Sequence, residues 1–318
     1  MLPSAAGQTV TPLRLAAPDD GAASYDWEHI AYLLPGALPT LIDPGPDHLA
    51  AALLNALAER GIAPSDIAQL LLTSHAAEMA GSASRFPSAT IFAAPTASDD
   101  RLLRAHRECA RSLGEEVVEA TQATPAARAI WERWQALHPV TPVTLANLRP
   151  LTDGALLLAG DGTLVASRRP AFSDTGMVFA SLDGEALFAG EFGLLDDDLP
   201  VGDWQAFAES LGAITQGTLP QLLYPARGRI EASGQVAFRA MALSANNLIS
   251  NLPLALARPA TLQQLFERDL GYWPEAIAES ALRLVRLRSA LEELARAGVI
   301  YRQPAPTMLQ TGYAMIPT

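Results

Sequence analysis

The sequence predicts an α/β protein: a four-layered αββα sandwich followed by a small winged-helix-like module at the C-terminal end. Three features of the sequence lead to this prediction. The first 235 residues contain two successive blocks, each made of strands followed by a helix. Several of these strands are almost wholly apolar, as expected of a sheet that is buried on both faces. From about residue 236 the pattern becomes helical and ends in one short β segment.

The first block contains five predicted elements. Residues 25–46 predict two short strands, the second ending in LPTLIDPG. Apolar residues at helical spacing predict a helix over 48–60, which Gly61 ends. The run IAQLLLTS predicts a strand buried on both faces, and SATIFAAP at 88–95 predicts another.

The second block repeats this order after a helical segment at 98–138. ALLLAGDGTLVASRRP predicts a hairpin that turns at Gly160-Asp161-Gly162. GMVFASLDGEALFAGEFG predicts a second hairpin that turns at Asp183-Gly184. A helix at 203–212 and a buried strand in QLLYPARG complete the sandwich domain, to which we assign residues 1–235.

The C-terminal part is predicted to be helical. Helices are expected at 238–250, 261–269 and 275–297, before the strand-like run VIYRQ. Thr261 is the expected N-cap of the second helix, and Gly271 and Gly298 are expected helix stops. Three helices and a β segment resemble a winged helix, so residues 236–302 form the second predicted module. Residues 303–318 are expected to be a loosely tied tail.

The composition excludes several classes of function. The chain has 318 residues, 49% of them apolar, and no apolar run approaches the ~18 residues of a membrane-spanning helix. Its first residues lack the basic and apolar blocks of a secretory signal, so we expect a cytoplasmic protein that does not act at a membrane. The net charge of −12 argues against a general surface for nucleic acids or anionic lipids.

Two residue types narrow the possible chemistry further. All 22 basic residues are arginine, so a P-loop lysine, a Schiff-base lysine and a lysine general base are excluded. Cys109 is the only cysteine, which excludes an intramolecular disulfide and a cysteine-rich zinc site. Its helical spacing from Leu102, Leu103 and Leu113 indicates a buried thiol rather than a nucleophile.

The order of four motifs points to a family. LIDPG, a helix, LLLTSHAAEMAG, a strand and hairpin, LFAGEFG and YPARG together resemble the metallo-β-lactamase fold superfamily over residues 25 to about 230. More narrowly, SDTGMVFASLDGEALFAGEFG is similar to the flavodiiron, or oxygen-binding di-iron, branch. The C-terminal module resembles the one appended to some glyoxalase-II-like hydrolases of this superfamily. The resemblance also implies a homodimer.

The metal ligands of this family are missing from the first motif. In the family it reads Thr-His-x-His-x-Asp-His-x-Gly, with Glu for the second His in di-iron members, and its imidazoles and carboxylates bind Zn²⁺ or Fe at about 2.0–2.2 Å. With Thr73 and Gly81 as anchors, the ligand positions hold Ser74, Ala76, Glu78 and Met79. His75 falls on the variable position, whose side chain should point away from the site.

The second-half ligands are missing as well. The family's next His falls near Phe172, its bridging Asp on Glu191 and its last His on Arg227. The five histidines are His29, His48, His75, His106 and His138, so no imidazole follows residue 138. A two-metal site with the family's ligand set is therefore absent, and we expect no cofactor. The predicted vestigial pocket comprises Asp43, Ser74, Ala76, Glu78, Met79, Phe172, Asp174, Glu191 and Arg227.

A protein cation is predicted to replace the metal. Two facing carboxylates, Glu78 and Glu191, repel unless a cation lies between them, and a guanidinium can bind carboxylates in bidentate fashion. We hypothesise that Arg227, helped by Arg168 or Arg169, occupies the vacated position and bridges the two acids.

The alternative at this position is a residual metal site. Asp43, Glu78 and Glu191 together could hold Mg²⁺ or Mn²⁺ weakly.

Other signals have simpler interpretations. No GxSxG, Walker A, GxGxxG or HExxH motif occurs, although a hidden Ser-His-Asp set stays open. Asp196-Asp197-Asp198 is interpreted as an exposed acidic loop. His29, His106 and His138 are interpreted as surface or capping residues. Trp131 and Trp134, three residues apart, indicate core or subunit packing, with a ligand shelf as the alternative.

The last predicted helix carries Arg283, Arg286 and Arg288, as a nucleic-acid recognition helix would. Apolar residues cover much of its surface, however, which favours domain docking or dimerisation.

Three hypotheses for the function follow. The preferred one is a pseudoenzyme: a metal-free pocket with a binding, regulatory or assembly role and an unidentified small-molecule or protein partner. The second is a hydrolase or di-iron oxidoreductase with a shifted site at Asp43, Glu78, Asp174 and Glu191. The third is a nucleic-acid-binding protein that acts through residues 258–302.

Overall fold

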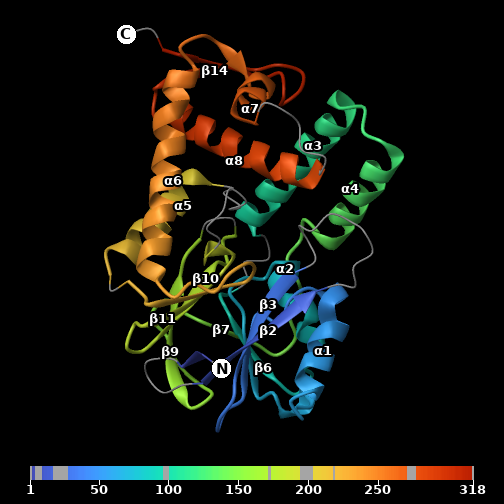
Figure 1. Ribbon diagram of the computed structural model, residues 1–318, viewed down its shortest axis with the longest axis vertical. Coiled ribbons are helices and arrows are strands. Elements are labelled where there is room, and N and C mark those ends of the chain that lie inside the picture. The colour runs from blue at the N-terminus through green and yellow to red at the C-terminus, as the bar shows by residue number, and fades with distance from the viewer. Residues whose placement is uncertain are drawn as a thin grey trace.

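Two large β-sheets lie face to face in the protein, and helices flank them (Figure 1). The computed structural model describes residues 2–3, 9–16, 28–95, 100–170, 173–193, 203–217, 219–270 and 277–316. Within these residues the hydrophobic side chains fall into separate clusters between the layers. The predicted αββα sandwich is confirmed.

The first sheet comes from the N-terminal half of the chain. In the described residues its strand order is β1-β2-β3-β4-β5-β6-β7, antiparallel as far as β4 and parallel from β4 to β7. The strands are β1 (Leu2–Pro3), β2 (Thr9–Ala16), β3 (Glu28–Leu34), β4 (Thr40–Ile42), β5 (Gln69–Leu71), β6 (Thr90–Ala93) and β7 (Leu148–Pro150). Sequence reasoning missed β1 and β2, because Pro12 interrupts the pattern of β2.

Alternating side chains of β3 show how this sheet is buried on both faces. Ile30 and Tyr32 point into the core between the two sheets, whereas Ala31 and Leu33 point toward helix α1 (Ala50–Ala58). The period of two residues in a strand sends neighbours to opposite faces. Because both faces of these strands are buried, their sequences are nearly continuous apolar runs.

The second sheet has the order β12-β11-β10-β9-β8 in the described residues. Its strands are β8 (Leu156–Ala159), β9 (Gly162–Arg168), β10 (Met177–Ser181), β11 (Ala186–Gly190) and β12 (Leu222–Pro225). Both predicted hairpins are confirmed, with Gly160 at φ 58° and Gly184 at φ 75° in the turns. Positive φ costs glycine little, because glycine has no Cβ to clash with the backbone.

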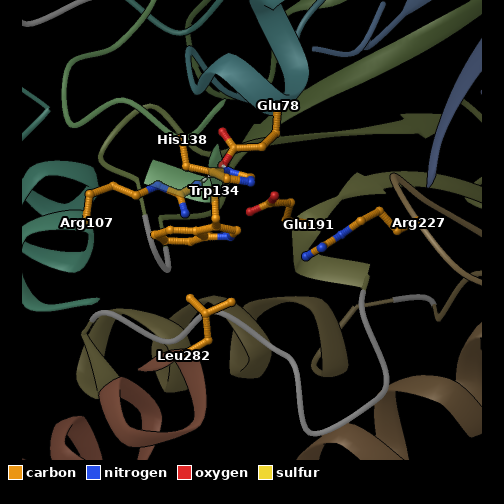
Figure 2. Close-up of a pocket in the computed structure, with 7 residues that line it drawn as sticks. All are labelled: Glu78, Arg107, Trp134, His138, Glu191, Arg227 and Leu282. Carbon is orange, nitrogen blue, oxygen red and sulfur yellow. Dashed lines mark hydrogen bonds and ion pairs between the residues drawn. The ribbon is translucent and has the colours of Figure 1, made fainter. Parts of the chain in front are cut away.

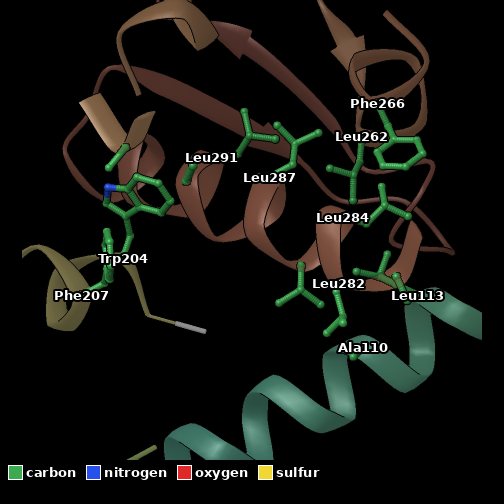
Figure 3. Packing of buried hydrophobic residues seen from close by; sticks show 14 of the residues in the cluster. Ala110, Leu113, Trp204, Phe207, Leu262, Phe266, Leu282, Leu284, Leu287 and Leu291 are labelled. Atoms are coloured by element: carbon green, nitrogen blue, oxygen red, sulfur yellow. The ribbon is translucent and has the colours of Figure 1, made fainter. Parts of the chain in front are cut away.

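A single hydrophobic cluster joins the outer face of the second sheet to the C-terminal helices. It contains Val178 and Leu187 of the sheet together with Phe207 of α5 (Trp204–Thr215) and Phe238 of α6 (Gly234–Ala255). The same cluster extends through helix α8 (Ile277–Arg296), as Figure 3 shows in part. The C-terminal helices therefore share one core with the sandwich.

The segment 98–138 is two helices rather than one. Helix α3 (Arg101–Ala120) ends before Gln122, which has φ 50°, and α4 (Pro125–Leu137) begins behind its N-cap Thr124. A proline at the first position favours a helix start because its fixed φ suits the helix. The chain reverses at this break, so that α4 lies alongside α3 (Figure 1).

The C-terminal part contains helices and a small sheet. α6 is followed by β13 (Ala260–Thr261), α7 (Leu262–Leu270), α8, β14 (Ile300–Gln303) and β15 (Gly312–Met315). The hydroxyl of Thr261 accepts a hydrogen bond from the Gln264 amide, as an N-cap should, and Gly298 ends α8 with φ 72°. Gly271 lies outside the described residues. The winged-helix assignment stays a prediction.

The expected loose tail is wrong for residues 303–316. β15 is the central strand of the three-stranded sheet β13-β15-β14 in the described residues, and it pairs with both neighbours. Leu309 and Tyr313 are buried in the large hydrophobic cluster. Burial of these two side chains outweighs the entropy of ordering a proline-containing segment. Among the described helices, none combines the length and apolar character needed to cross a membrane.

The order of this segment can be tested by matched tyrosine substitutions. Tyr313 is 1% exposed, whereas Tyr301 on the neighbouring strand is 39% exposed. We expect Tyr313→Ala to lower the free energy of unfolding by about 3–5 kcal/mol, because it leaves a cavity. Tyr301→Ala should cost less than about 1 kcal/mol. Urea unfolding measures both, and equal costs would contradict the packing of β15.

Candidate functional site

Both sheets direct the carboxyl ends of parallel strands toward one crevice. β4 and β5 are parallel, and they are followed by Asp43 and by the loop that leads to Glu78. β11 and β12 are parallel too, and they are followed by Glu191 and Arg227. In open α/β sheets, ligand sites lie at such carboxyl edges because the loops there are free to vary. The two halves of the predicted vestigial pocket therefore meet.

Asp43 holds the loop of the first motif in place. Its two carboxylate oxygens accept hydrogen bonds from the Thr73 amide at 2.8 Å and the Thr73 hydroxyl at 2.7 Å. Its own carbonyl accepts a hydrogen bond from His29 Nε2 at 2.8 Å. Burial raises the pKa of Asp43 to about 7, and the charge of Glu191 contributes in the same direction.

Glu78 is held by two side chains from the helical layer. The guanidinium of Arg107, on α3, forms an ion pair with its carboxylate. His138, the C-cap residue of α4, places Nδ1 against the same oxygen. The three side chains are 12%, 5% and 9% exposed, respectively. The cation that neutralises Glu78 therefore comes from α3.

A stack of aromatic rings packs against this ion pair. The ring of His138 stacks on Trp134 at 4.7 Å, and Trp134 stacks on Trp131 at 4.9 Å between ring centroids. The guanidinium carbon of Arg107 lies 5.7 Å from the centre of the Trp134 ring, within the range of a cation–π contact. Gly114 permits the packing of α4 on α3, because a Cβ there would lie 2.2 Å from the Trp131 ring.

The crevice itself combines acids, arginines and an aromatic wall. Figure 2 shows the carboxylates of Glu78 and Glu191 between Arg107 on one side and Arg227 on the other. The volume of the crevice is about 260 Å³, counting the part that is open to solvent. An adjoining lobe shares Glu78, His138, Glu191 and Arg227 with it. The lining residues are Glu78, Arg107, Trp134, His138, Glu191, Arg227 and Leu282.

The predicted pocket residues separate into two groups. Glu78, Glu191 and Arg227 line the crevice, and Met79 lines the adjoining lobe. Ser74 instead accepts a hydrogen bond from the Ala76 amide, and both side chains are buried. Phe172 and the run 196–198 lie outside the described residues.

One member of the shifted carboxylate site, Asp174, does not line the crevice. The carboxylate of Asp174 accepts hydrogen bonds from the amides of Arg101 and Leu102 and so occupies the N-terminus of α3. Arg168 donates to the Asp174 carbonyl, and Arg169 donates to the Arg168 carbonyl. Asp174 and the two arginines that were expected to help Arg227 thus make other contacts.

The donor set does not fit the family's metals. At the four aligned positions of the first motif only Glu78 offers a metal-binding oxygen on a carboxylate, and its charge is already matched by Arg107. In the second half, the position of the last His holds Arg227, a cation that repels metal ions. Within the described ranges, no three His, Cys, Asp or Glu side chains are arranged to hold a metal ion.

Sequence reasoning missed the residues from α3 and α4. The interpretation of His29 and His106 as surface or capping residues is wrong, since they are 3% and 2% exposed and lie within β3 and α3. His138 is a capping residue, the C-cap of α4, but it is buried, with 7% exposed. The prediction that 98–138 is a helical segment did not include the reversal that returns His138 to Arg107. One signal was available: Arg107 follows Leu103 by four residues and so falls on the apolar face of α3.

Trp131 and Trp134 are both buried, as predicted for packing residues, and Trp134 also forms a wall of the crevice. The predicted buried thiol of Cys109 is partly buried and accepts a hydrogen bond from Arg288.

The arginines of α8 make contacts inside the protein. Arg283 forms an ion pair with Glu279 at 2.9 Å, and Arg286 donates to Ser244 at 3.0 Å. Arg288 donates to the sulfur of Cys109 at 3.0 Å. Because α8 packs against α3 and the other outer helices, it resembles a packing helix more than a recognition helix.

The comparisons with known proteins identify the fold. The structure is similar to a metallo-beta-lactamase family protein from Thermus thermophilus, with a TM-score of 0.70, 18% sequence identity, and coverage of 96% of this chain and 98% of that one. It is also similar to a beta-lactamase domain protein from Burkholderia ambifaria, with a TM-score of 0.67, 16% identity, and coverage of 99% and 95%. No family model and no curated protein matches the sequence.

A third likeness concerns the same fold. Rubredoxin oxygen:oxidoreductase from Desulfovibrio gigas aligns with a TM-score of 0.52 and 12% identity, over 84% of this chain and 73% of that one. The chain therefore has the metallo-β-lactamase fold. The first two alignments are long enough to include the C-terminal helices.

The ion pair of Glu78 and Arg107 should contribute strongly to stability. We expect Arg107→Met to lower the free energy of unfolding by about 3–5 kcal/mol, because it leaves a buried carboxylate without its cation. The double variant with Glu78→Gln should recover part of this loss. Arg104→Met, which removes an exposed arginine from the same helix, should cost less than about 1 kcal/mol. Additive effects in this double-mutant cycle would contradict the pairing.

The buried histidines should make the protein sensitive to acid. Burial lowers the pKa of His29 and of His106 to about 4, so the unfolded chain takes up their protons at a higher pH than the folded chain. Stability should therefore fall between about pH 6.5 and pH 4, by up to roughly 3 kcal/mol for each histidine. Asp43, with its raised pKa, acts in the opposite direction over about pH 4 to 7.

Two variants separate these contributions. His106→Gln should make the fall on acidification shallower, whereas Asp43→Asn should make it steeper. The free energy of unfolding, measured in urea across this pH range, checks both. An unchanged slope in His106→Gln would show that His106 does not titrate as its burial implies.

Proposed function

We propose that the protein is a non-catalytic member of the metallo-β-lactamase fold, with a metal-free crevice that serves a binding, regulatory or assembly role. One observation carries this proposal: Arg107 and His138 already engage Glu78, the only carboxylate kept at the first ligand motif. A metal ion at this point would have to displace a buried guanidinium. The desolvated pair resists such a change, because the released arginine would lose its counter-charge in a buried environment.

The charge of the crevice supports the same role. Glu78 and Glu191 are opposed by Arg107 and Arg227, so the two acids and two arginines balance. Catalytic sites of this fold rely on a cation to polarise the substrate and to generate a nucleophile from water. A crevice with balanced fixed charges and an aromatic wall is better suited to hold a ligand than to activate water.

The proposal includes the homodimer that the resemblance implies. Helix α6 has one charged residue, Arg239, in its 22 residues. It exposes Val236, Leu243 and Leu254 by 65%, 61% and 74%, at spacings of seven and eleven residues that keep them on one face. Such an apolar face is typical of a contact surface.

Metal analysis tests the central claim. Protein purified from cells grown with added zinc, iron and manganese should contain far less than one ion per chain, as measured by plasma mass spectrometry. Its Tm should change neither with a chelator nor with excess Zn²⁺, because an ion that does not bind the folded state cannot stabilise it. A stoichiometric metal that survives dialysis would overturn the proposal.

A further inference from the structure

The solvent-facing side of helix α6 lacks the charges that such a surface usually carries. Six exposed residues, none of them charged, recur along it at alternating intervals of four and three positions: Val236, Ala240, Leu243, Asn247, Ser250 and Leu254. These residues are called the α6 stripe below. A surface helix of a globular protein normally presents charged and polar residues on the face opposite its core. Figure 1 shows α6 along one side of the molecule, between the second sheet and the C-terminal helices.

The opposite face of α6 packs inside the protein. The large hydrophobic cluster contains five residues of this face: Ala237, Phe238, Met241, Ala245 and Leu252. With 3.6 residues per turn, the α6 stripe lies about half a turn away from them. The helix therefore has two apolar faces, one used by the fold and one that a single chain leaves in contact with solvent.

The spacing of the α6 stripe is that of a two-stranded coiled coil. In heptad terms the a positions hold Ala240, Asn247 and Leu254, and the d positions hold Val236, Leu243 and Ser250. A single Asn at an a position fixes the register of paired helices, because its amide needs a polar partner across the seam. Asn247 is such a residue, with large apolar side chains on both sides of it along the stripe.

We propose that α6 pairs in parallel with α6 of a second copy of this chain, about a two-fold axis. The inference rests on the homodimer of the proposed function and assigns its interface. In the parallel alignment each residue meets its own copy, so that amide meets amide at Asn247 and leucine meets leucine at Leu243. An antiparallel alignment over the full stripe sets Asn247 against Leu243, where its amide has no partner. One that joins Leu243 to Leu254 leaves Val236 outside the contact.

Charge favours a second copy as the occupant of this surface. Each chain carries a net charge of −12, so two copies repel wherever their charged surfaces meet. Along α6 the only charged residue is Arg239, and the α6 stripe itself has none, so two copies can approach closely there. A strongly charged partner would find no opposite charge on this stripe to pair with.

The length of the α6 stripe sets the expected strength of the pairing. From Val236 to Leu254 the helix extends about 27 Å, and its width is about 10 Å. The contact is therefore smaller than the roughly 800 Å² per partner of a standard interface. We expect a reversible dimer with a Kd of about 10–100 µM.

Sedimentation equilibrium of the full chain, from about 5 to 500 µM, tests this proposal. The wild-type mass should rise from one chain toward two. Leu243→Glu places like charges opposite each other within the stripe and should raise the Kd at least about tenfold. Leu156→Glu is the matched control, because Leu156 on β8 is 65% exposed and Leu243 is 61% exposed. It should leave the Kd unchanged. Both side chains are exposed in one chain, so both variants should fold with the wild-type Tm.

The outcomes separate this inference from the proposed function. A dimer that persists in Leu243→Glu would overturn the inference alone. A wild-type monomer at the highest concentration would overturn the inference and the homodimer together, and would leave α6 to a different protein. The metal analysis described above decides the metal-free crevice independently of both.

Cross-linking tests the orientation. Cys109 is the only cysteine, so Cys109→Ser gives a background without thiols. In this background Leu243→Cys should form a covalent dimer on mild oxidation, because the two copies of this residue face each other, whereas Leu156→Cys should not. Cross-linking that occurs only in a mixture of the Leu243→Cys and Leu254→Cys proteins would overturn the parallel alignment.

Discussion

The buried contact of Glu78 with Arg107 and His138 joins the two parts of the molecule that form the crevice. Glu78 belongs to the loop at the edge of the first sheet, and its two partners belong to α3 and to the end of α4. Because all three side chains are largely withdrawn from water, each depends on the others for compensation of its charge or hydrogen bonds. Together with the hydrogen bonds of Asp174 to the start of α3, this contact holds the α3–α4 pair over the sheet edge.

In the metal-free crevice proposed above, the same contact takes part in holding the loops in place. In a metal site, an ion neutralises the acids at the sheet edge and ties the loops of the two sheets together. Here Arg107 neutralises Glu78, and hydrogen bonds from Thr73 to Asp43 tie the ends of β4 and β5. In the proposed metal-free crevice, this ion pair and these hydrogen bonds hold the loops that an ion would otherwise join.

The helical cover turns an open sheet edge into an enclosed crevice. Trp134 from α4 and Leu282 from α8 form walls that the sandwich alone would lack. α8 also lies in the large hydrophobic cluster that continues to α5 and the second sheet. Packed side chains therefore connect the walls of the crevice to the C-terminal helices.

The sequence by itself determined the layers and both hairpin turns, and it is the source of the prediction that the metal ligands are lost. These features depend on local properties: the period of apolar residues, glycines at positive φ such as Gly160 and Gly184, and the chemistry of residues at aligned motif positions. Only the tertiary structure decided that Arg107 is the cation on Glu78, that His138 is buried beside it and that β15 completes a sheet. Arg107 and His138 lie 29 and 60 residues from Glu78 in the chain. Such contacts depend on how the chain reverses near Gln122 and on how α4 packs on α3. No local pattern specifies that packing.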